Sequence, residues 1–224
     1  MKMLVSAAVV TLAIAATVDA SSAAAAGSEL CTVAKQNPCL EANMVKEKTT
    51  ISAKLKTGQV VEVRMGLFGT LTCAVSTTTF KTTSTGSATE HILLDMEAWT
   101  FGTCKFGGNN CTSVQGSNVG VGMEAVNGKY VTNAASADGV ITLERNKKGD
   151  EWGLNANCPG LGCALRTGKM EIALFGGLQA TIGAGGEPFN TVEVTGGKCP
   201  VGQPLEYDGS YEISSPKSMF GVPR

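Results

Sequence analysis

Histidine is nearly missing from this sequence of 224 residues, which contains one, His91. Structural zinc sites combine closely spaced cysteine and histidine ligands, and a serine-hydrolase triad needs a histidine base beside an activated serine. No G-x-S-x-G motif accompanies His91. We therefore expect no metal site, no cofactor and no catalytic residues of the serine-hydrolase kind.

Charged and aromatic residues are scarce too, at 17% and 5% of the chain, and the formal net charge is −1. Such a composition lacks the basic surface that attracts nucleic acids or anionic lipids. We therefore expect no nucleic-acid partner. The sequence also lacks a proline- and serine-rich linker that would divide it, and this favours one domain over two.

The longest apolar run lies at the N-terminus. Lys2 precedes the apolar segment Met3–Ala16, and Val18-Asp19-Ala20 or Ala24-Ala25-Ala26 offers small residues for cleavage. The run is shorter than the roughly 20 residues that a membrane-spanning helix needs. We predict a signal peptide and small-residue spacer over residues 1–26, no membrane span, and a single β-rich domain over residues 27–224. The protein would then be secreted, either extracellular or associated with the cell envelope.

Cysteine, in contrast, is abundant. In an oxidising compartment an even number of cysteines indicates disulfides, here up to four among the eight cysteines Cys31, Cys39, Cys73, Cys104, Cys111, Cys158, Cys163 and Cys199. Proximity in the sequence favours the pairs Cys31–Cys39, Cys104–Cys111, Cys158–Cys163 and Cys73–Cys199. The alternative scheme pairs Cys73 with Cys104, Cys111 with Cys158, and Cys163 with Cys199.

Short segments in which apolar and polar residues alternate recur between turn residues, at spacings near ten residues. This pattern is typical of the strands of a β-sandwich or barrel. The expected strands are Thr50–Leu55, Val60–Met65, Thr70–Val75, Ser76–Thr85, Thr89–Phe101, Thr112–Ala125, Tyr130–Thr132, Val140–Glu144, Trp152–Asn157, Ala164–Arg166, Lys169–Leu174, Leu178–Ile182, Thr191–Val194 and Tyr211–Ile213. Helix is expected at most in short pieces near Cys39–Val45. We predict an all-β, disulfide-stapled β-sandwich or barrel-like domain.

The segment Thr89–Phe101 carries the only candidate acid–base pair. Alternation places Ile92, Leu94, Met96 and Ala98 on one face of the strand, with His91, Asp95 and Glu97 on the other. Paired carboxylates hydrolyse glycosides when a cleft surrounds them. On a strand such residues more often form a solvated face, so a glycoside hydrolase is the less favoured interpretation.

Two tryptophan–cysteine units resemble one another: Trp99 lies ahead of Cys104 and Cys111, and Trp152 lies ahead of Cys158 and Cys163. A tryptophan beside a disulfide commonly packs in the core of a sandwich. If the indoles are exposed instead, Trp99 and Trp152 would form stacking platforms for a sugar ring. The loop between Cys104 and Cys111 would suit a protease inhibitor if it were extended and exposed.

Several short motifs resemble a group of uncharacterised secreted β-rich proteins of actinobacteria. They are Asn37-Pro38-Cys39, Thr72-Cys73, the stretch from Trp99 to Cys104, Gly197-Lys198-Cys199-Pro200, and the ending from Gly209 to Lys217. The resemblance implies an exported single domain and carries no catalytic residues. We therefore expect a non-enzymatic structural or interaction protein of the cell surface, with a cell-envelope component or a glycan as partner. The alternative is a binding module for a glycan or a small ligand that uses Trp99 or Trp152.

Overall fold

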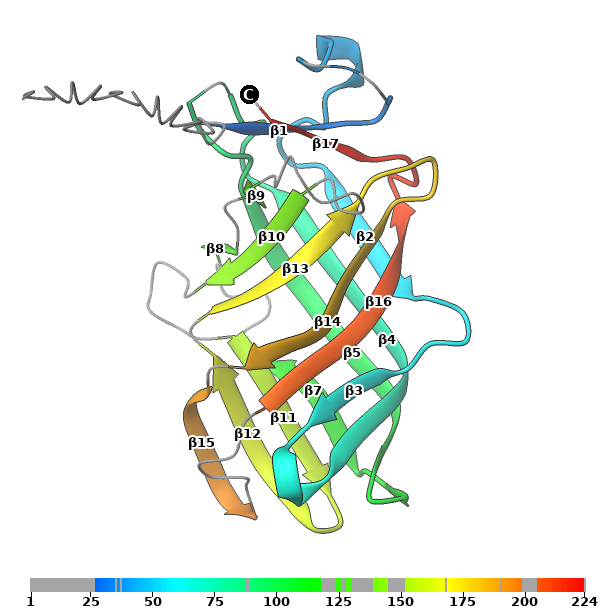
Figure 1. Ribbon diagram of the computed structural model, residues 1–224, viewed down its shortest axis with the longest axis vertical. Coiled ribbons are helices and arrows are strands. Elements are labelled where there is room, and N and C mark those ends of the chain that lie inside the picture. Colours follow the sequence, from blue (N-terminus) through cyan, green and yellow to red (C-terminus); the bar gives the residue numbers. More distant parts are fainter. Residues whose placement is uncertain are drawn as a thin grey trace, which may run out of the picture.

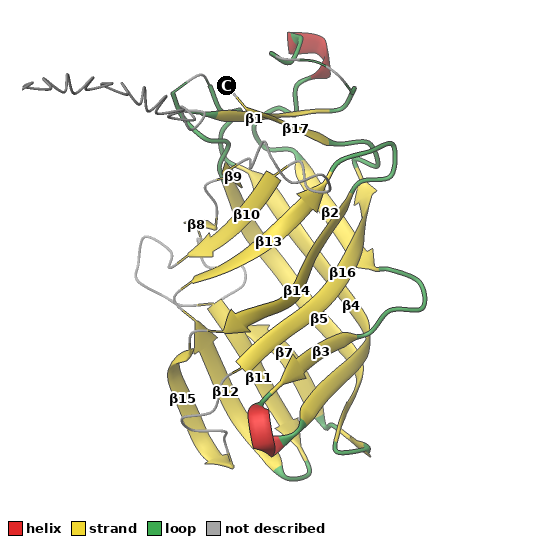
Figure 2. Cartoon of the chain, viewed as in Figure 1, coloured by secondary structure: helices red, strands yellow, loops and turns green. Residues whose placement is uncertain are grey.

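The computed structural model describes residues 27–34, 36, 38–87, 89–117, 124–125, 128–129, 139–144, 152–167, 169–189, 191–198 and 205–223. The expected signal peptide and the expected strand Tyr130–Thr132 lie outside these residues. Within them there is no α-helix, which confirms the all-β prediction (Figure 2). No helix among them is long and apolar enough to cross a membrane.

The elements follow one another along the chain as strands and two short 3-10 helices. They are β1 (Ser28–Cys31), η1 (Glu41–Asn43), β2 (Thr50–Leu55), β3 (Val61–Arg64), η2 (Gly66–Phe68), β4 (Thr70–Thr82), β5 (Leu94–Phe106), β6 (Asn109–Asn110), β7 (Ser113–Ser117), β8 (Glu124–Ala125), β9 (Gly128–Lys129), β10 (Gly139–Glu144), β11 (Trp152–Cys158), β12 (Leu161–Thr167), β13 (Lys169–Phe175), β14 (Thr181–Phe189), β15 (Thr191–Lys198), β16 (Leu205–Ser215) and β17 (Phe220–Pro223). The helix η1 falls where a short helical piece was expected.

Most strands join one antiparallel sheet in the order β15-β12-β11-β7-β5-β4-β2-β16-β14-β13-β10-β9. The sheet coils, as twisted sheets of many strands do, so that β10, β13, β14 and β16 lie across β4 and β5 (Figure 1). This confirms the predicted sandwich-like arrangement. The separate pair β1–β17 lies at one end of the molecule, and η2 lies at the other.

Alternation along the strands builds the core between the two layers. In β16 every second residue from Leu205 to Ile213 is buried, which is the period of two that a strand with one buried face shows. The largest fully buried side chains come from strands on both sides of the coil and from the residues next to them: Tyr207, Phe80, Met65, Leu71, Ile92, Leu143, Leu154, Leu161, Leu165 and Leu174.

The strand β5 departs from the expected alternation at one residue. Its register with β4 shifts between the pairs Thr79–Ala98 and Phe80–Met96, so Glu97 is an extra residue in a β-bulge. A one-residue insertion exchanges the faces of all later residues. Met96 is therefore buried as predicted, but Trp99 rather than Ala98 continues the buried face. The prediction for Ala98 was wrong for this reason.

Further along the same two strands, the buried face changes again. In β4 the consecutive residues Ala74 and Val75 are both exposed, whereas Cys73 and Ser76 on either side are buried. Opposite them, Thr103 has a φ of 52°, a conformation that is rare for a β-branched residue. The single strand β4 replaces the expected strands Thr70–Val75 and Ser76–Thr85. The face of β4 that points to the core changes between Ala74 and Val75.

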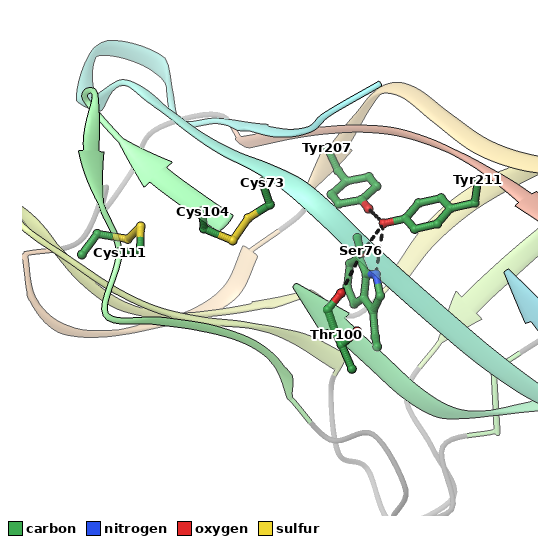
Figure 3. Close-up of a disulfide and its surroundings, with 9 residues drawn as sticks. Cys73, Ser76, Thr100, Cys104, Cys111, Tyr207 and Tyr211 are labelled. Carbon is green, nitrogen blue, oxygen red and sulfur yellow. Dashed lines mark hydrogen bonds between the residues drawn. A yellow bond between two sulfur atoms is a disulfide. The ribbon is translucent and has the colours of Figure 1, made fainter. Parts of the chain in front are cut away.

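One disulfide joins two neighbouring strands of the sheet, and another joins a loop residue to a strand. Cys73 on β4 faces Cys104 on β5, with their Cα atoms 4.0 Å apart (Figure 3). Cys111 is bonded to Cys158 of β11, and Cys31 is bonded to Cys39. The predicted pairs Cys104–Cys111, Cys158–Cys163 and Cys73–Cys199 were therefore wrong, because cross-strand register, not sequence proximity, brings the sulfurs together.

Three pairs of the two schemes are confirmed: Cys31–Cys39, Cys73–Cys104 and Cys111–Cys158. Cys163 is disulfide-bonded too, and Cys199 lies outside the described residues. Disulfides persist in oxidising compartments. The bonding of these cysteines therefore indicates a protein of an oxidising, extracellular environment.

Candidate functional site

Trp99, one of the two candidate platform residues, lies in the core. It is 6% exposed, and its ring packs against Phe101 and Tyr207 at centroid distances of 4.6 and 5.4 Å. The bulge at Glu97 is what turns it inward. An indole in this position does not offer an open face for sugar stacking. Of Trp152 only the backbone is described, as the first residue of β11, so its predicted role lies outside the described part of the chain.

The indole N–H of Trp99 belongs to a buried network of hydroxyl groups (Figure 3). It donates to the Tyr211 hydroxyl oxygen over 3.2 Å. The Tyr211 hydroxyl also lies 2.6 Å from the Tyr207 hydroxyl and 2.9 Å from Ser76 Oγ. Ser76 Oγ in turn donates to the carbonyl oxygen of Thr100 over 2.8 Å.

The direction of every bond in this network follows from its last acceptor. A carbonyl oxygen only accepts hydrogen bonds, so the Ser76 hydroxyl donates its one proton to the Thr100 carbonyl oxygen. The Tyr211 hydroxyl must therefore donate to Ser76 Oγ. Tyr207 must then donate to Tyr211. The Tyr211 oxygen thus accepts two hydrogen bonds, from Trp99 and from Tyr207, while its proton goes to Ser76. The network links β4, β5 and β16.

A cavity of about 10 Å³ adjoins the network and is lined by apolar side chains from both layers, among them Phe80, Leu143, Ile172 and Ile182. A space of this size holds at most about one water molecule. The interior of the coiled sheet is therefore packed, and no ligand pocket exists at this place.

The two tyrosines predict how stability depends on alkaline pH. Burial raises the pKa of Tyr207 well above the usual 10, and the neighbouring Tyr211 raises it further. Burial also raises the pKa of Tyr211, and its hydrogen bonds to Ser76, Tyr207 and Trp99 offset part of the rise. Above pH ~10 the unfolded chain loses these protons while the folded chain keeps them.

We therefore expect the free energy of unfolding to be unaffected by these groups below pH 10 and to fall above it by about 1.4 kcal/mol per pH unit for each tyrosine. Urea unfolding at pH 8 to 11 measures this. Tyr207→Phe should reduce the fall in the free energy of unfolding above pH 10 by about 1.4 kcal/mol per pH unit. An equal slope in the variant and the parent would contradict the assignment.

The candidate carboxylates Asp95 and Glu97 lie on either side of Met96 in β5. Glu97 sits in the bulge and its carboxylate lies 3.7 Å from Lys81 Nζ. Asp95 precedes the bulge and is half-buried. His91 lies before the first residue of β5, and its Nδ1 is 3.2 Å from Ser28 Oγ. Burial alternates regularly from His91 to Met96, and the bulge at Glu97 ends the regular alternation on which the expected shared face was based.

The segment between Cys104 and Cys111 is a closed hairpin. Lys105 faces Asn110 across the β5–β6 pair, and the Cys111 N–H donates to the Cys104 carbonyl over 2.9 Å. It is not the extended loop that a protease inhibitor would present.

A row of uncharged polar side chains crosses four adjacent strands on the outer surface. Thr77 of β4 faces Thr100 of β5, Thr100 faces Gln115 of β7, and Gln115 faces Asn155 of β11. All four are exposed. Ser113 of β7 and Asn157 of β11, also exposed, face each other. We call these six residues the polar face.

Register alone sets the dimensions of the polar face. Adjacent strands lie about 4.8 Å apart, so the row from Thr77 to Asn155 is about 14 Å long. The hydroxyls of Thr77 and Thr100 lie 2.6 Å apart, and Arg166 Nη2 donates to Asn155 Oδ1 over 2.9 Å. Each hydroxyl and amide both donates and accepts hydrogen bonds. The row can therefore bind a ligand that carries hydroxyl groups at regular spacing.

A groove of about 510 Å³ runs beside this row, between β5 and β7. The two strands share a single ladder pair, Thr100–Gln115. The groove is lined by eight uncharged residues: Trp99, Thr100, Phe101, Thr112, Ser113, Val114, Gln115 and Gly116. A side chain on Gly116 would place its Cβ 2.6 Å from the Trp99 carbonyl oxygen, so glycine is needed there. Half-buried Phe101 supplies the accessible aromatic surface.

A cluster of charged residues lies on β3 and β16. Arg64 of β3 donates to Glu206 and Asp208 of β16, both over 2.9 Å, and lies 3.4 Å from Glu62. The hydrogen bond to Glu62, together with Glu206 and Asp208, raises the pKa of Arg64, against a smaller effect of burial. Within the described residues no three histidine, cysteine or acidic side chains are placed to hold a metal ion.

Sequence reasoning missed the polar face because its members come from four separate strands. One signal was available: the threonine-rich stretch Ser76–Thr85 was expected to have a polar outer face, and Thr77 belongs to it. The partners of Thr77 follow only from the register. No family model matches this chain, and no curated protein or solved structure matches it either.

Proposed function

We propose that the protein is exported through a cleaved signal peptide over residues 1–26 and acts as a non-enzymatic interaction module at the cell surface. Its binding surface is the polar face with the adjoining groove, and its ligand is a neutral glycan, such as a polysaccharide of the cell envelope. The observation that carries this proposal is the uncharged row Thr77-Thr100-Gln115-Asn155 beside a groove of about 510 Å³.

The chemistry of the lining favours a glycan over other ligands. Its hydroxyl and amide groups match the donors and acceptors of sugar hydroxyls, and Phe101 adds an apolar contact at the groove. None of the residues of the polar face or of the groove lining is charged. The row meets charged side chains at its two ends, where Lys54 faces Thr77 and Arg166 donates to Asn155, so a neutral glycan fits the row itself better than a polyanion or a strongly charged peptide. The ion pair of Glu97 with Lys81 supports a role without catalysis.

Retention on insoluble polysaccharides tests the proposal. We expect saturable binding of the intact protein to at least one of cellulose, chitin and peptidoglycan sacculi. Raising the salt from 0.1 to 1 M should change it little, because the side chains of the polar face and of the groove lining are uncharged. The double variant Gln115→Ala/Asn155→Ala removes two side-chain hydrogen bonds of about 1 kcal/mol each, and should weaken binding about tenfold or more.

Asn109→Ala is the matched control. Asn109 is an exposed amide in the β5–β6 hairpin, outside the polar face, and its replacement should leave retention unchanged. The proposal fails if none of the three polysaccharides retains the protein, or if the double variant and the control bind as the parent does.

A further inference from the structure

Among the described residues, three turns that contain no charged residue lie at the end of the molecule at η2. They are Met65–Thr70 around η2, Phe106–Asn110 between β5 and β6, and Cys158–Leu161 between β11 and β12. The turns meet on the Phe106 ring: a Cβ on Gly69 would lie 3.5 Å from it, and one on Gly160 would lie 3.8 Å from it. Figure 1 shows this end opposite the β1–β17 pair.

Two large apolar side chains project from this end. Leu67 is 96% exposed and Phe68 is 43% exposed, both on the single turn of η2 (Figure 2). Scattered exposed apolar residues are normal, but here two successive ones cap a tip whose neighbouring turns consist of glycine, asparagine, proline and apolar residues.

Two backbone hydrogen bonds close the turn at the tip. The Phe68 N–H donates to the Met65 carbonyl over 3.0 Å, and the Met65 N–H donates to the Gly69 carbonyl over 2.9 Å. Gly69 closes the turn with a φ of 120°, which other residues rarely adopt. Peptide groups that enter hydrocarbon must be paired within the protein, and these two bonds pair the N–H groups of Met65 and Phe68.

We infer that Leu67 and Phe68 anchor the protein to a lipid bilayer, inserting at the level of the headgroups and the first acyl carbons. A protein partner fits less well, because stable interfaces bury about 1,200–2,000 Å² in total and involve 20 or more residues on each side. A two-residue tip offers far less. A neutral lipid interface needs no counter-charge, and the three uncharged turns could enter it without burying a charge.

Flotation with phosphatidylcholine vesicles tests this inference on the full mature protein. We expect the protein to float with the vesicles and Leu67→Ser/Phe68→Ser to lower the partition coefficient about tenfold or more, since each buried apolar side chain contributes more than a factor of ten. Leu67→Trp, which keeps the tip apolar, should float as the parent does. Leu178→Ser is the matched control, because Leu178 is 84% exposed beside Gly177, which pairs with Met219 near β17 at the opposite end.

Three results would overturn it. The parent protein fails to float, the tip variant floats as well as the parent, or the Leu178→Ser control loses flotation to the same degree. Sedimentation equilibrium tests the alternative that the tip binds a second copy of this chain. Self-association of the parent protein that is abolished by Leu67→Ser/Phe68→Ser would support this alternative and contradict the lipid anchor. Both serine substitutions replace exposed side chains, and far-UV circular dichroism verifies that the variants fold.

Discussion

Replacing Tyr211 with phenylalanine is expected to lower the free energy of unfolding by about 2–4 kcal/mol, although only one oxygen atom is removed. The Tyr211 oxygen accepts hydrogen bonds from Trp99 and Tyr207. Its loss leaves both of these buried donors without that acceptor. Each of these two lost buried hydrogen bonds costs about 1–2 kcal/mol, whereas the Ser76 hydroxyl keeps its bond to Thr100.

Tyr207→Phe is the matched control for this prediction. It also removes one buried hydroxyl, but the Tyr211 oxygen still accepts the Trp99 N–H. We expect a loss of about 1 kcal/mol, the net value of one ordinary hydrogen bond. Urea unfolding followed by tryptophan fluorescence measures both variants at pH 7. Equal losses of stability in the two variants would contradict the inferred directions of the hydrogen bonds, in which the Tyr211 oxygen accepts from both Trp99 and Tyr207.

Removing the disulfide Cys111–Cys158 is expected to have the largest effect on stability. The two cysteines are 47 residues apart, and in the chain-entropy model a cross-link over such a loop stabilises the fold by about 4 kcal/mol. The bond also ties the segment between β6 and β7 to β11. Cys111→Ala/Cys158→Ala should therefore lower the denaturation midpoint markedly while the remaining disulfides stay formed.

The variant Cys31→Ala/Cys39→Ala provides the comparison. Its loop spans 8 residues, for which the same model gives about 2.5 kcal/mol. Chemical denaturation of both variants under non-reducing conditions, with peptide mapping of the remaining disulfides, measures the difference. If the short-loop variant loses as much stability as the long-loop variant, loop closure does not account for the contribution of these bonds.

Much of the all-β architecture was predictable, because alternation with a period of two is a local property of the chain. Val61–Arg64 and Thr50–Leu55, for example, are strands where the pattern placed them. The resemblance to secreted actinobacterial proteins stays a prediction. The disulfide scheme could not be chosen from the sequence, since Cys73 and Cys104 meet through the register of two strands of 13 residues each.

The burial of Trp99 agrees with the interpretation that a tryptophan beside a disulfide packs in the core, but strand alternation alone does not predict it. Alternation through Leu94 and Met96 predicts an outward-facing residue at 99, and a single extra residue at Glu97 reverses this. Nothing in the local residue types marks the bulge. The polar face, likewise, depends on four strands whose alignment is a property of the whole sheet.

The bulge at Glu97 also restricts how the length of this chain can change. A deletion of Glu97 itself would remove the bulge and restore regular pairing, with Trp99 still opposite Thr78 and facing inward and Thr100 still facing outward. A deletion or insertion of two residues would keep both on their present sides. A one-residue deletion is therefore tolerated at the bulge, whereas a one-residue change elsewhere between Met96 and Cys104 would exchange the faces of the residues that follow it.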